Sequence, residues 1–177
     1  MRDSDPKTGI DLSIIRMDGD RVAKKLIATA FDEQLGEVSP DGRWLAYQSN
    51  ESGREEIHVR PFSDVNSGHW QVSADGGSRP SWARSGRELF YVDFRGRIVS
   101  VPVQSGAGFE YGNPTVVLEQ GSLPTSGAGR NYDTSVDGKR FLVLRNAVRA
   151  GDQAAPPQLN VVLNWTDEIA RLVPARR

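Results

Sequence analysis

The two histidines, His58 and His69, are the first candidates for acid–base or metal chemistry, because imidazole can move protons or bind an ion. The chain has no cysteine, so thiolate nucleophiles, disulfides and cysteine metal sites are excluded. A zinc site would therefore have to combine the histidines with carboxylates. No His-x-His pattern joins them, and we interpret both as ordinary strand and loop residues. The sequence thus predicts no metal site and no cofactor.

Other candidate motifs have structural interpretations. No Gly-x-Ser-x-Gly elbow marks a serine nucleophile. Asp41 and Asp137 lack the repeated acidic spacing of a calcium loop, so hairpin structure is the better interpretation. The glycine-rich loop at residues 75–78 lacks the spacing of a phosphate-binding loop. We therefore predict no catalytic residue.

The composition describes a folded domain of nearly balanced charge. Lysine and arginine number 22 against 23 acidic residues, and the net charge is −1. This balance gives no electrostatic footprint for nucleic acid, and we expect none as a partner. No run approaches the roughly 18 apolar residues that a membrane-spanning helix needs. Residues 1–9 are polar, and we expect them to be disordered or to mark a cut point in a longer protein.

Short strand patterns replace helical periodicity along the chain. At residues 57–60 the apolar and polar side chains alternate, which places Ile57 and Val59 on one face and His58 and Arg60 on the other. Many short strands separated by turn residues predict an antiparallel all-β domain. The predicted strands cover residues 10–16, 43–48, 56–62, 70–73, 88–92, 97–103, 115–119, 140–145 and 159–164.

A glycine turn followed by a basic residue and an apolar pair occurs three times, at Gly42, Gly86 and Gly138. The spacing is close to the ~40–50 residues of one four-stranded propeller blade. In the first copy, Pro40 and Asp41 suit the central positions of a type I turn, and Gly42 takes the positive φ that follows. The recurrence therefore predicts stacked sheets of a β-propeller.

These motifs resemble the repeat of TolB-like propellers, which are of the Pro-Asp, WD-repeat-like type. The resemblance rests on Ser-Pro-Asp-Gly-Arg at residues 39–43, Trp-Leu-Ala-Tyr at 44–47, the loop at 49–54 and Glu-Ile-His-Val at 56–59. The later copies depart from it, with Arg-Ser at residues 84–85 and Val136 in place of proline.

Four further segments resemble those that close the C-terminal propellers of some bacterial serine/threonine kinases. They are His-Val-Arg-Pro-Phe at residues 58–62, Trp-Gln-Val-Ser at 70–73, Asp-Gly-Gly at 75–77 and Leu-Asn-Trp at 163–165. The resemblance implies a periplasmic or extracytoplasmic location, whereas the residues themselves leave the compartment open.

The expected architecture is a partial β-propeller of about three to four four-stranded antiparallel blades over residues 10–177. A short helix at residues 166–173 is expected to follow the last blade, since Thr166 is a suitable N-cap. The tryptophans are expected to pack between blades. The predicted blades are residues 10–29 (incomplete), 36–73, 78–119 and 131–165.

Arginines recur in the loops that are expected to connect blades, and one shared rim would be positively charged. Such a rim could hold an acidic peptide or a carboxylate. The candidate ligand-binding residues are Arg54, Arg79, Arg95 and Arg130.

Two functions stay open at this stage, beside a third possibility that the chain is a purely structural fragment with no ligand. One is a non-catalytic module for protein or peptide binding, scaffolding or sensing, within a larger protein. The alternative is a hydrolase of the esterase or peptidase type, with a site in the propeller funnel or at an oligomer interface. An incomplete ring leaves blade edges open, so we also expect self-association.

Overall fold

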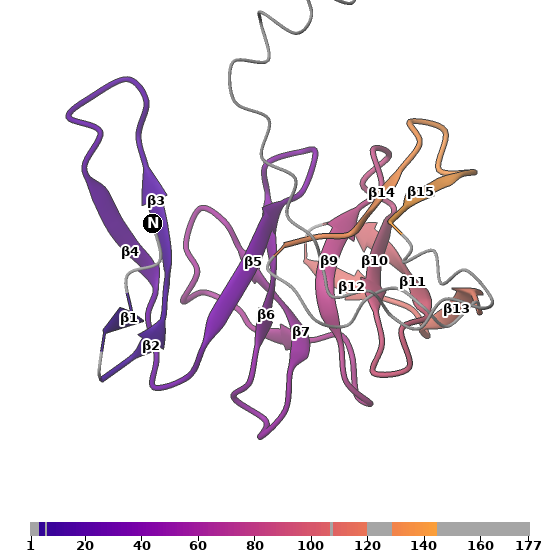
Figure 1. Ribbon diagram of the computed structural model, residues 1–177. Coiled ribbons are helices and arrows are strands. Elements are labelled where there is room, and N and C mark those ends of the chain that lie inside the picture. The colour runs from indigo at the N-terminus through magenta and orange to yellow at the C-terminus, as the bar shows by residue number, and fades with distance from the viewer. Residues whose placement is uncertain (1–3, 6, 107, 120–128, 145–177) are drawn as a thin grey trace, which may run out of the picture. The chain divides into compact units, whose positions relative to one another are not determined.

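The computed structural model describes residues 4–5, 7–106, 108–119 and 129–144, and their regular structure is entirely β-strand (Figure 1). The all-β fold class is confirmed, while the predicted helix at residues 166–173 lies outside the described residues. The first strands are β1 (Ser4–Asp5), β2 (Gly9–Ile10), β3 (Leu12–Ile15), β4 (Ala23–Ile27), β5 (Glu33–Val38), β6 (Trp44–Ser49), β7 (Glu56–Pro61) and β8 (Trp70–Gln71). The remaining strands are β9 (Ser78–Trp82), β10 (Glu88–Val92), β11 (Ile98–Ser105), β12 (Phe109–Tyr111), β13 (Thr115–Leu118), β14 (Tyr132–Thr134) and β15 (Phe141–Val143).

Consecutive strands pair with one another, so each sheet is a meander. Strands β5 to β8 form a four-stranded antiparallel sheet in chain order. The next sheet runs β9-β10-β11-β12, with β13 also paired to β11. The hairpins β3–β4 and β14–β15 precede and follow these two sheets in the sequence. Successive meander sheets of this kind are the blades of a partial β-propeller.

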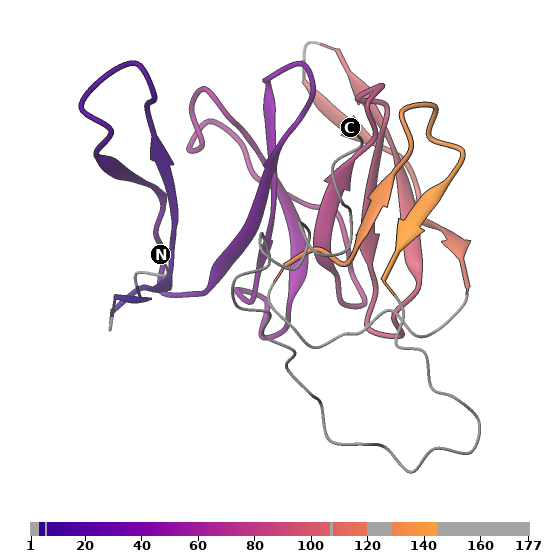
Figure 2. The same ribbon diagram turned by 45° about the horizontal axis from the view of Figure 1, so that its top comes forward.

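The sheets stack face to face, because alternate side chains of a strand enter different cores. On β10, Leu89 and Tyr91 pack toward β5–β8, and Phe90 and Val92 pack toward β14–β15. The other face of β5–β8 contacts the β3–β4 hairpin through a third cluster that contains Leu45. In Figures 1 and 2 the orange β14–β15 hairpin accordingly lies beside the sheet that precedes it. Burial on both faces is what stacked blades require.

The predicted glycine turn occurs three times with one hydrogen-bond pattern. Ser39 donates its N–H to Trp44 O, and Gly42 donates to Ser39 O, both at 2.8 Å. The same bonds join Ala83 to Glu88, Gly86 to Ala83, Ser135 to Arg140 and Gly138 to Ser135. The three glycines have φ values of 73°, 68° and 68°, a conformation that side chains with a Cβ rarely adopt. The sequence repeat is therefore a structural repeat.

The turn aspartates hold the turns, as predicted. Asp41 accepts hydrogen bonds from Ser39 Oγ at 2.6 Å and from Arg43 N at 3.1 Å. Asp137 accepts the N–H of Lys139 at 3.1 Å. Both carboxylates thus act as turn caps.

The predicted alternation on β7 is also confirmed. Ile57 and Val59 are fully buried in the core between the two large sheets. Trp44, Trp70 and Trp82 belong to or pack against the same core, as expected for tryptophans between blades. The fourth tryptophan, Trp165, and the later part of the predicted last blade lie outside the described residues, so the blade boundaries stay a prediction.

Candidate functional site

An open groove of about 980 Å³ lies beside the turn that joins β10 to β11. Its lining includes Arg54, Asp75, Phe94, Arg95 and the backbone of the loop before β9. We call it the Arg95 groove. Turn and loop residues form the rim of the groove, and strand residues such as Tyr91, Val99 and Val116 complete its lining. Loops held by a rigid scaffold are a common origin of binding surfaces.

One wall owes its shape to Asp93, which is buried at the end of β10. Its carboxylate accepts the N–H groups of Arg95 and Arg97, both at 2.9 Å, and pairs with the Arg97 guanidinium at 2.7 Å. With Gly96 at φ 75°, the turn closes tightly and directs Phe94 outward, 63% exposed. The Arg95 guanidinium lies 5.1 Å from the centre of the Phe94 ring, within cation–π range.

The opposite wall rests on Glu56, a fully buried carboxylate on β7. Glu56 Oε1 accepts Arg54 Nε at 2.7 Å and Gly76 N at 2.9 Å, and its other oxygen accepts Ser73 Oγ. A buried carboxylate needs such partners. They hold the guanidinium of Arg54, whose side chain stays 57% exposed, and they hold the turn before β9.

The arginines that line the groove differ in whether they form an ion pair. Arg54 is paired with Glu56, and Arg97 is paired with Asp93. Within the part of the chain that the structure describes, Arg95 makes no ion pair. Arg95 is therefore the cation best placed to meet a carboxylate on a ligand.

The four arginines predicted from the sequence fall into two groups. Arg54 and Arg95 line the same groove. Arg79 is buried, and its Nε donates to Gly129 O at 2.9 Å. Arg130 contacts Glu37 and donates to Ser81 Oγ at 2.9 Å, which places it beside β5 and β9, the first strands of the two large sheets. The structure thus brings together two of the four candidates, and it buries Arg79 within the protein.

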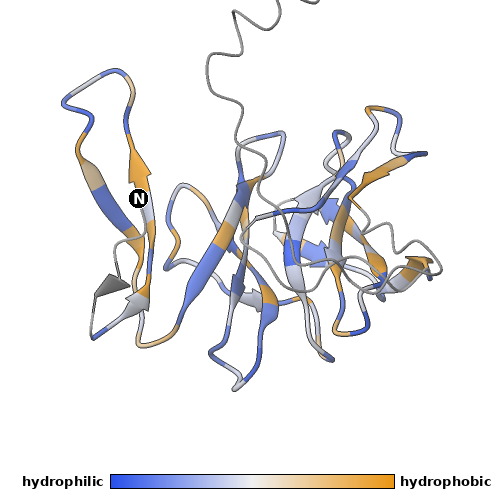
Figure 3. Cartoon of the chain, in the orientation of Figure 1, coloured by the Kyte–Doolittle hydropathy of each residue, from blue (hydrophilic) through white to orange (hydrophobic). Residues whose placement is uncertain are grey.

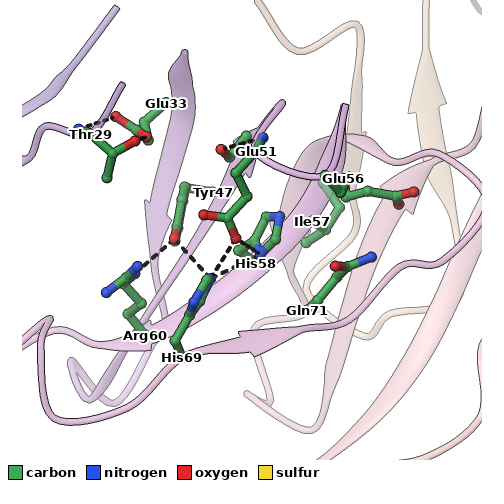
Figure 4. A network of polar contacts seen from close by, with 12 residues as sticks. Thr29, Glu33, Tyr47, Glu51, Glu56, Ile57, His58, Arg60, His69 and Gln71 are labelled. Carbon is green, nitrogen blue, oxygen red and sulfur yellow. Dashed lines mark hydrogen bonds and ion pairs between the residues drawn. The ribbon is translucent and has the colours of Figure 1, made fainter. Parts of the chain in front are cut away.

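A separate polar cluster lies on the other face of β6 and β7 (Figure 4). Glu51 comes from the turn after β6, His58 from β7 and His69 from the loop before β8. Glu51 Oε1 is 3.1 Å from His58 Nδ1 and 3.0 Å from His69 Nε2, and the two nitrogens are 3.0 Å apart. We call these three residues the Glu51–His58–His69 cluster.

Tyr47 and Arg60 border this cluster. Tyr47 lies opposite His58 in the strand register, and its hydroxyl is 3.4 Å from His69 Nε2. Arg60 Nε donates to the Tyr47 hydroxyl at 2.8 Å, and Arg60 Nη1 donates to Val65 O at 2.8 Å. Burial raises the pKa of Tyr47 to about 12, so the phenol keeps its proton at neutral pH.

Both imidazoles are neutral at neutral pH. Burial lowers the pKa of His58 to about 4, and repulsion from Arg60, and from His69 whenever that ring is protonated, acts in the same direction. Burial, followed by Arg60, also lowers the pKa of His69. Their contacts with Glu51 are therefore those of neutral imidazoles with a carboxylate, and each ring offers a lone pair.

The histidines are strand and loop residues, as predicted, but their proximity was not foreseen. The available signal was the alternation at residues 57–60, which places His58 and Arg60 on the face opposite Ile57 and Val59. The sequence offers no signal for the path of the loop between β7 and β8, which brings His69 back over that face. In the described residues no serine hydroxyl bonds to either histidine, so these contacts form no Ser/His/Asp arrangement.

No family model and no curated protein matches this chain. Among solved structures, the chain is similar to a protein assigned as TolB from Agrobacterium tumefaciens, at 21% identity and a TM-score of 0.47. The likeness covers 64% of this chain and 44% of that one, so the chain spans less than half the length of that structure. The propeller architecture itself rests on the meander topology and the stacked cores described above.

Within the described residues, no helix has the length and apolarity needed to cross a membrane.

Proposed function

We propose that this partial propeller is a non-catalytic binding module that recognises an acidic peptide segment of a partner protein in the Arg95 groove. The observation that carries the proposal is the exposed Phe94–Arg95 pair at the edge of the groove. Arginine and aromatic side chains are the residue types that most often dominate interface energies. The arginine selects a carboxylate, and the ring supplies apolar contact area.

The support comes from how the pair is held. Asp93 fixes the turn that carries Phe94 and Arg95, so little order is lost when a ligand binds. On the opposite wall the Arg54 guanidinium is paired with Glu56 and lies 3.8 Å from Asp75, and its 57% exposure leaves N–H donors that a ligand carboxylate can reach. A peptide lying across the groove meets both walls. The resemblance to kinase-linked propellers adds a signal-receiving role to the proposal.

Fluorescence anisotropy with labelled peptides tests this function. Three peptides of equal length are compared: one acidic with a single aromatic residue, one neutral and one basic. The acidic peptide is expected to bind, more weakly at high salt because screening weakens exposed charge pairs. Arg95→Ala and Phe94→Ala are each expected to weaken binding about tenfold, which corresponds to about 1.4 kcal/mol. Arg84→Ala, an exposed change outside the groove, is the matched control. Equal binding of all three peptides contradicts the proposal.

We also propose that the chain associates with itself or with further blades through its two outer hairpins. Figure 3 shows hydrophobic residues along β3 and β15. Ile15 on β3 is 51% exposed and Leu142 on β15 is 75% exposed, and such side chains favour burial against a partner. Two copies could complete a ring of six to eight blades. Light scattering at micromolar concentration tests this, and a monomer contradicts it.

The hydrolase alternative has no specific support in the described residues, because the His58 and His69 contacts involve Tyr47, Glu51 and each other.

A further inference from the structure

We propose that Glu51, His58 and His69 form a binding site for one divalent transition-metal ion, with Zn²⁺ as the expected occupant. The ligand atoms are Glu51 Oε1, His58 Nδ1 and His69 Nε2. Two imidazoles and one carboxylate are a recurring zinc ligand set. The three ligand residues are not among those that line the Arg95 groove, so the two proposals are tested separately.

The size of the triangle fits an ion. The three atoms are separated by 3.0, 3.0 and 3.1 Å. Zinc binds nitrogen and oxygen ligands at roughly 2.0–2.2 Å, so two ligands at octahedral to tetrahedral angles lie roughly 2.8–3.6 Å apart. The side chains therefore need little movement to share one ion. The three come from a turn, a strand and a loop, and such convergence is not imposed by the sheet ladder alone.

No placement of hydrogen atoms on the two imidazoles makes all three contacts among Glu51, His58 and His69 attractive. If both ring nitrogens carry hydrogen and donate to Glu51, two donors face each other at 3.0 Å. If only one carries hydrogen, the bare nitrogen of the other ring faces the carboxylate oxygen at 3.0 or 3.1 Å, lone pair against lone pair. A cation at the centre makes all three contacts attractive.

The ligand types select the class of ion. Imidazole suits zinc, copper, nickel and iron, whereas Mg²⁺ and Ca²⁺ prefer oxygen ligands throughout. Glu51 supplies the single negative charge. Arg60 is near, but its guanidinium is held by Tyr47 and Val65 O rather than by the cluster.

The surroundings of the ligand side chains predict a moderate affinity for Zn²⁺. His58 Nε2 is buried and has no hydrogen-bond partner within the described residues. Metal-binding histidines usually donate their second N–H to an acceptor, and loss of such a partner weakens metal binding about 10–100-fold. Three protein ligands also leave one position for water. A bound ion would fix the β6–β7 turn and the β7–β8 loop to strand β7.

Calorimetry on the tag-free chain, stripped with a chelator and dialysed, tests the site with Zn²⁺ and with Mg²⁺. We expect one Zn²⁺ per chain, no Mg²⁺ binding and a higher melting temperature with Zn²⁺. Co²⁺ in place of Zn²⁺ gives a visible absorption spectrum that reports nitrogen and oxygen ligands. Failure of the wild-type chain to take up Zn²⁺ or Co²⁺ overturns the proposal.

Two conservative variants assign the ligands. His69→Gln and Glu51→Gln change partly exposed side chains, so they are less disruptive than any change at buried His58. Each is expected to weaken Zn²⁺ binding at least about tenfold, the lower limit for losing even an outer-shell partner. Glu110→Gln, an exposed change on β12, is the matched control. Circular dichroism confirms that each variant folds, and Zn²⁺ binding by both variants as tight as by the wild type overturns the assignment.

Discussion

The indole Nε1 of Trp82 donates a 3.0 Å hydrogen bond to the main-chain oxygen of Glu37. This bond joins β9 to β5, the first strands of two successive sheets. It is local evidence that the sheets are packed as blades, because a polar contact between their inner strands accompanies the apolar core. Propeller blades interact only with their neighbours, so such contacts bear directly on stability.

Trp82→Phe tests this link between sheets. The change keeps an aromatic ring in the core but leaves the Glu37 carbonyl without its donor, so we expect unfolding to become easier by about 1–3 kcal/mol. Urea denaturation followed by circular dichroism measures it. Trp70→Phe is the control, since the Trp70 indole donates to no described residue while its ring packs on the same core. Equal losses from both changes would mean that ring size alone matters.

Tyr132 makes the corresponding contact between the last described hairpin and β9. Its hydroxyl donates to Arg79 O at 2.8 Å, and its burial raises the pKa of the phenol well above its ordinary value. Tyr132→Phe should therefore cost about 1–3 kcal/mol of stability, because a buried carbonyl loses its donor. The hydroxyl of Tyr111 is in an exposed contact with Gln71 O, so Tyr111→Phe should change stability by less than about 0.5 kcal/mol. Unchanged stability of Tyr132→Phe would show that the hydrogen bond to Arg79 O does not hold the hairpin.

The glycine turn gives a third stability prediction. A Cβ at Gly42 would meet no atom within 4 Å. Any loss of stability in Gly42→Ala therefore comes from the positive φ of 73° and not from a steric clash. The expected loss is about 1–2 kcal/mol, the difference between the left-handed and right-handed conformations for a side chain with a Cβ. Gly19 has equally open surroundings without positive φ, so Gly19→Ala should be nearly neutral. Equal melting temperatures for the two variants would contradict the turn assignment.

Much of the fold follows from the sequence because its strongest signals are local. The turn residues at 39–42 and the alternation at 57–60 depend only on neighbours in the chain, and strands β6, β7, β10 and β11 were predicted near their observed limits. Strands β5 and β9 were missed. Gly36 and Pro80 interrupt them, and neither strand has a strong apolar pattern. Both pair on one side only, as sheet edges, where proline is tolerated.

The candidate sites were only partly predictable. Arg54 and Arg95 were predicted from loop positions, and both line the groove. Arg79 has the same sequence setting, yet it is buried, because a positive φ of 55° and the bond to Gly129 O turn it inward. The Glu51–His58–His69 cluster depends on the path of a loop, for which one sequence offers no short-range signal. Tertiary contacts of this kind decide which polar residues meet.

Glu56→Gln links stability to ligand binding. The substitution keeps the shape but removes the negative charge that holds Arg54, and it sets an amide against the donors of Gly76 and Ser73. We expect a loss of about 1–3 kcal/mol in stability and tighter binding of the acidic peptide, because the Arg54 guanidinium then lacks its partner charge. Chemical denaturation and anisotropy measure the two effects on one sample. Weaker stability with unchanged peptide affinity would exclude Arg54 from the ligand contact.

Charge reversal at the groove tests the proposed function most directly. In Arg95→Glu the cation nearest the exposed ring becomes an anion, while the Asp93 carboxylate still holds the turn through main-chain N–H groups. Anisotropy is measured with the acidic and the basic peptide on wild type and variant. We predict that the acidic peptide binds the variant at least about tenfold more weakly and that the basic peptide binds it more tightly. Unchanged affinities for both peptides would contradict the assignment of the Arg95 groove as the ligand site.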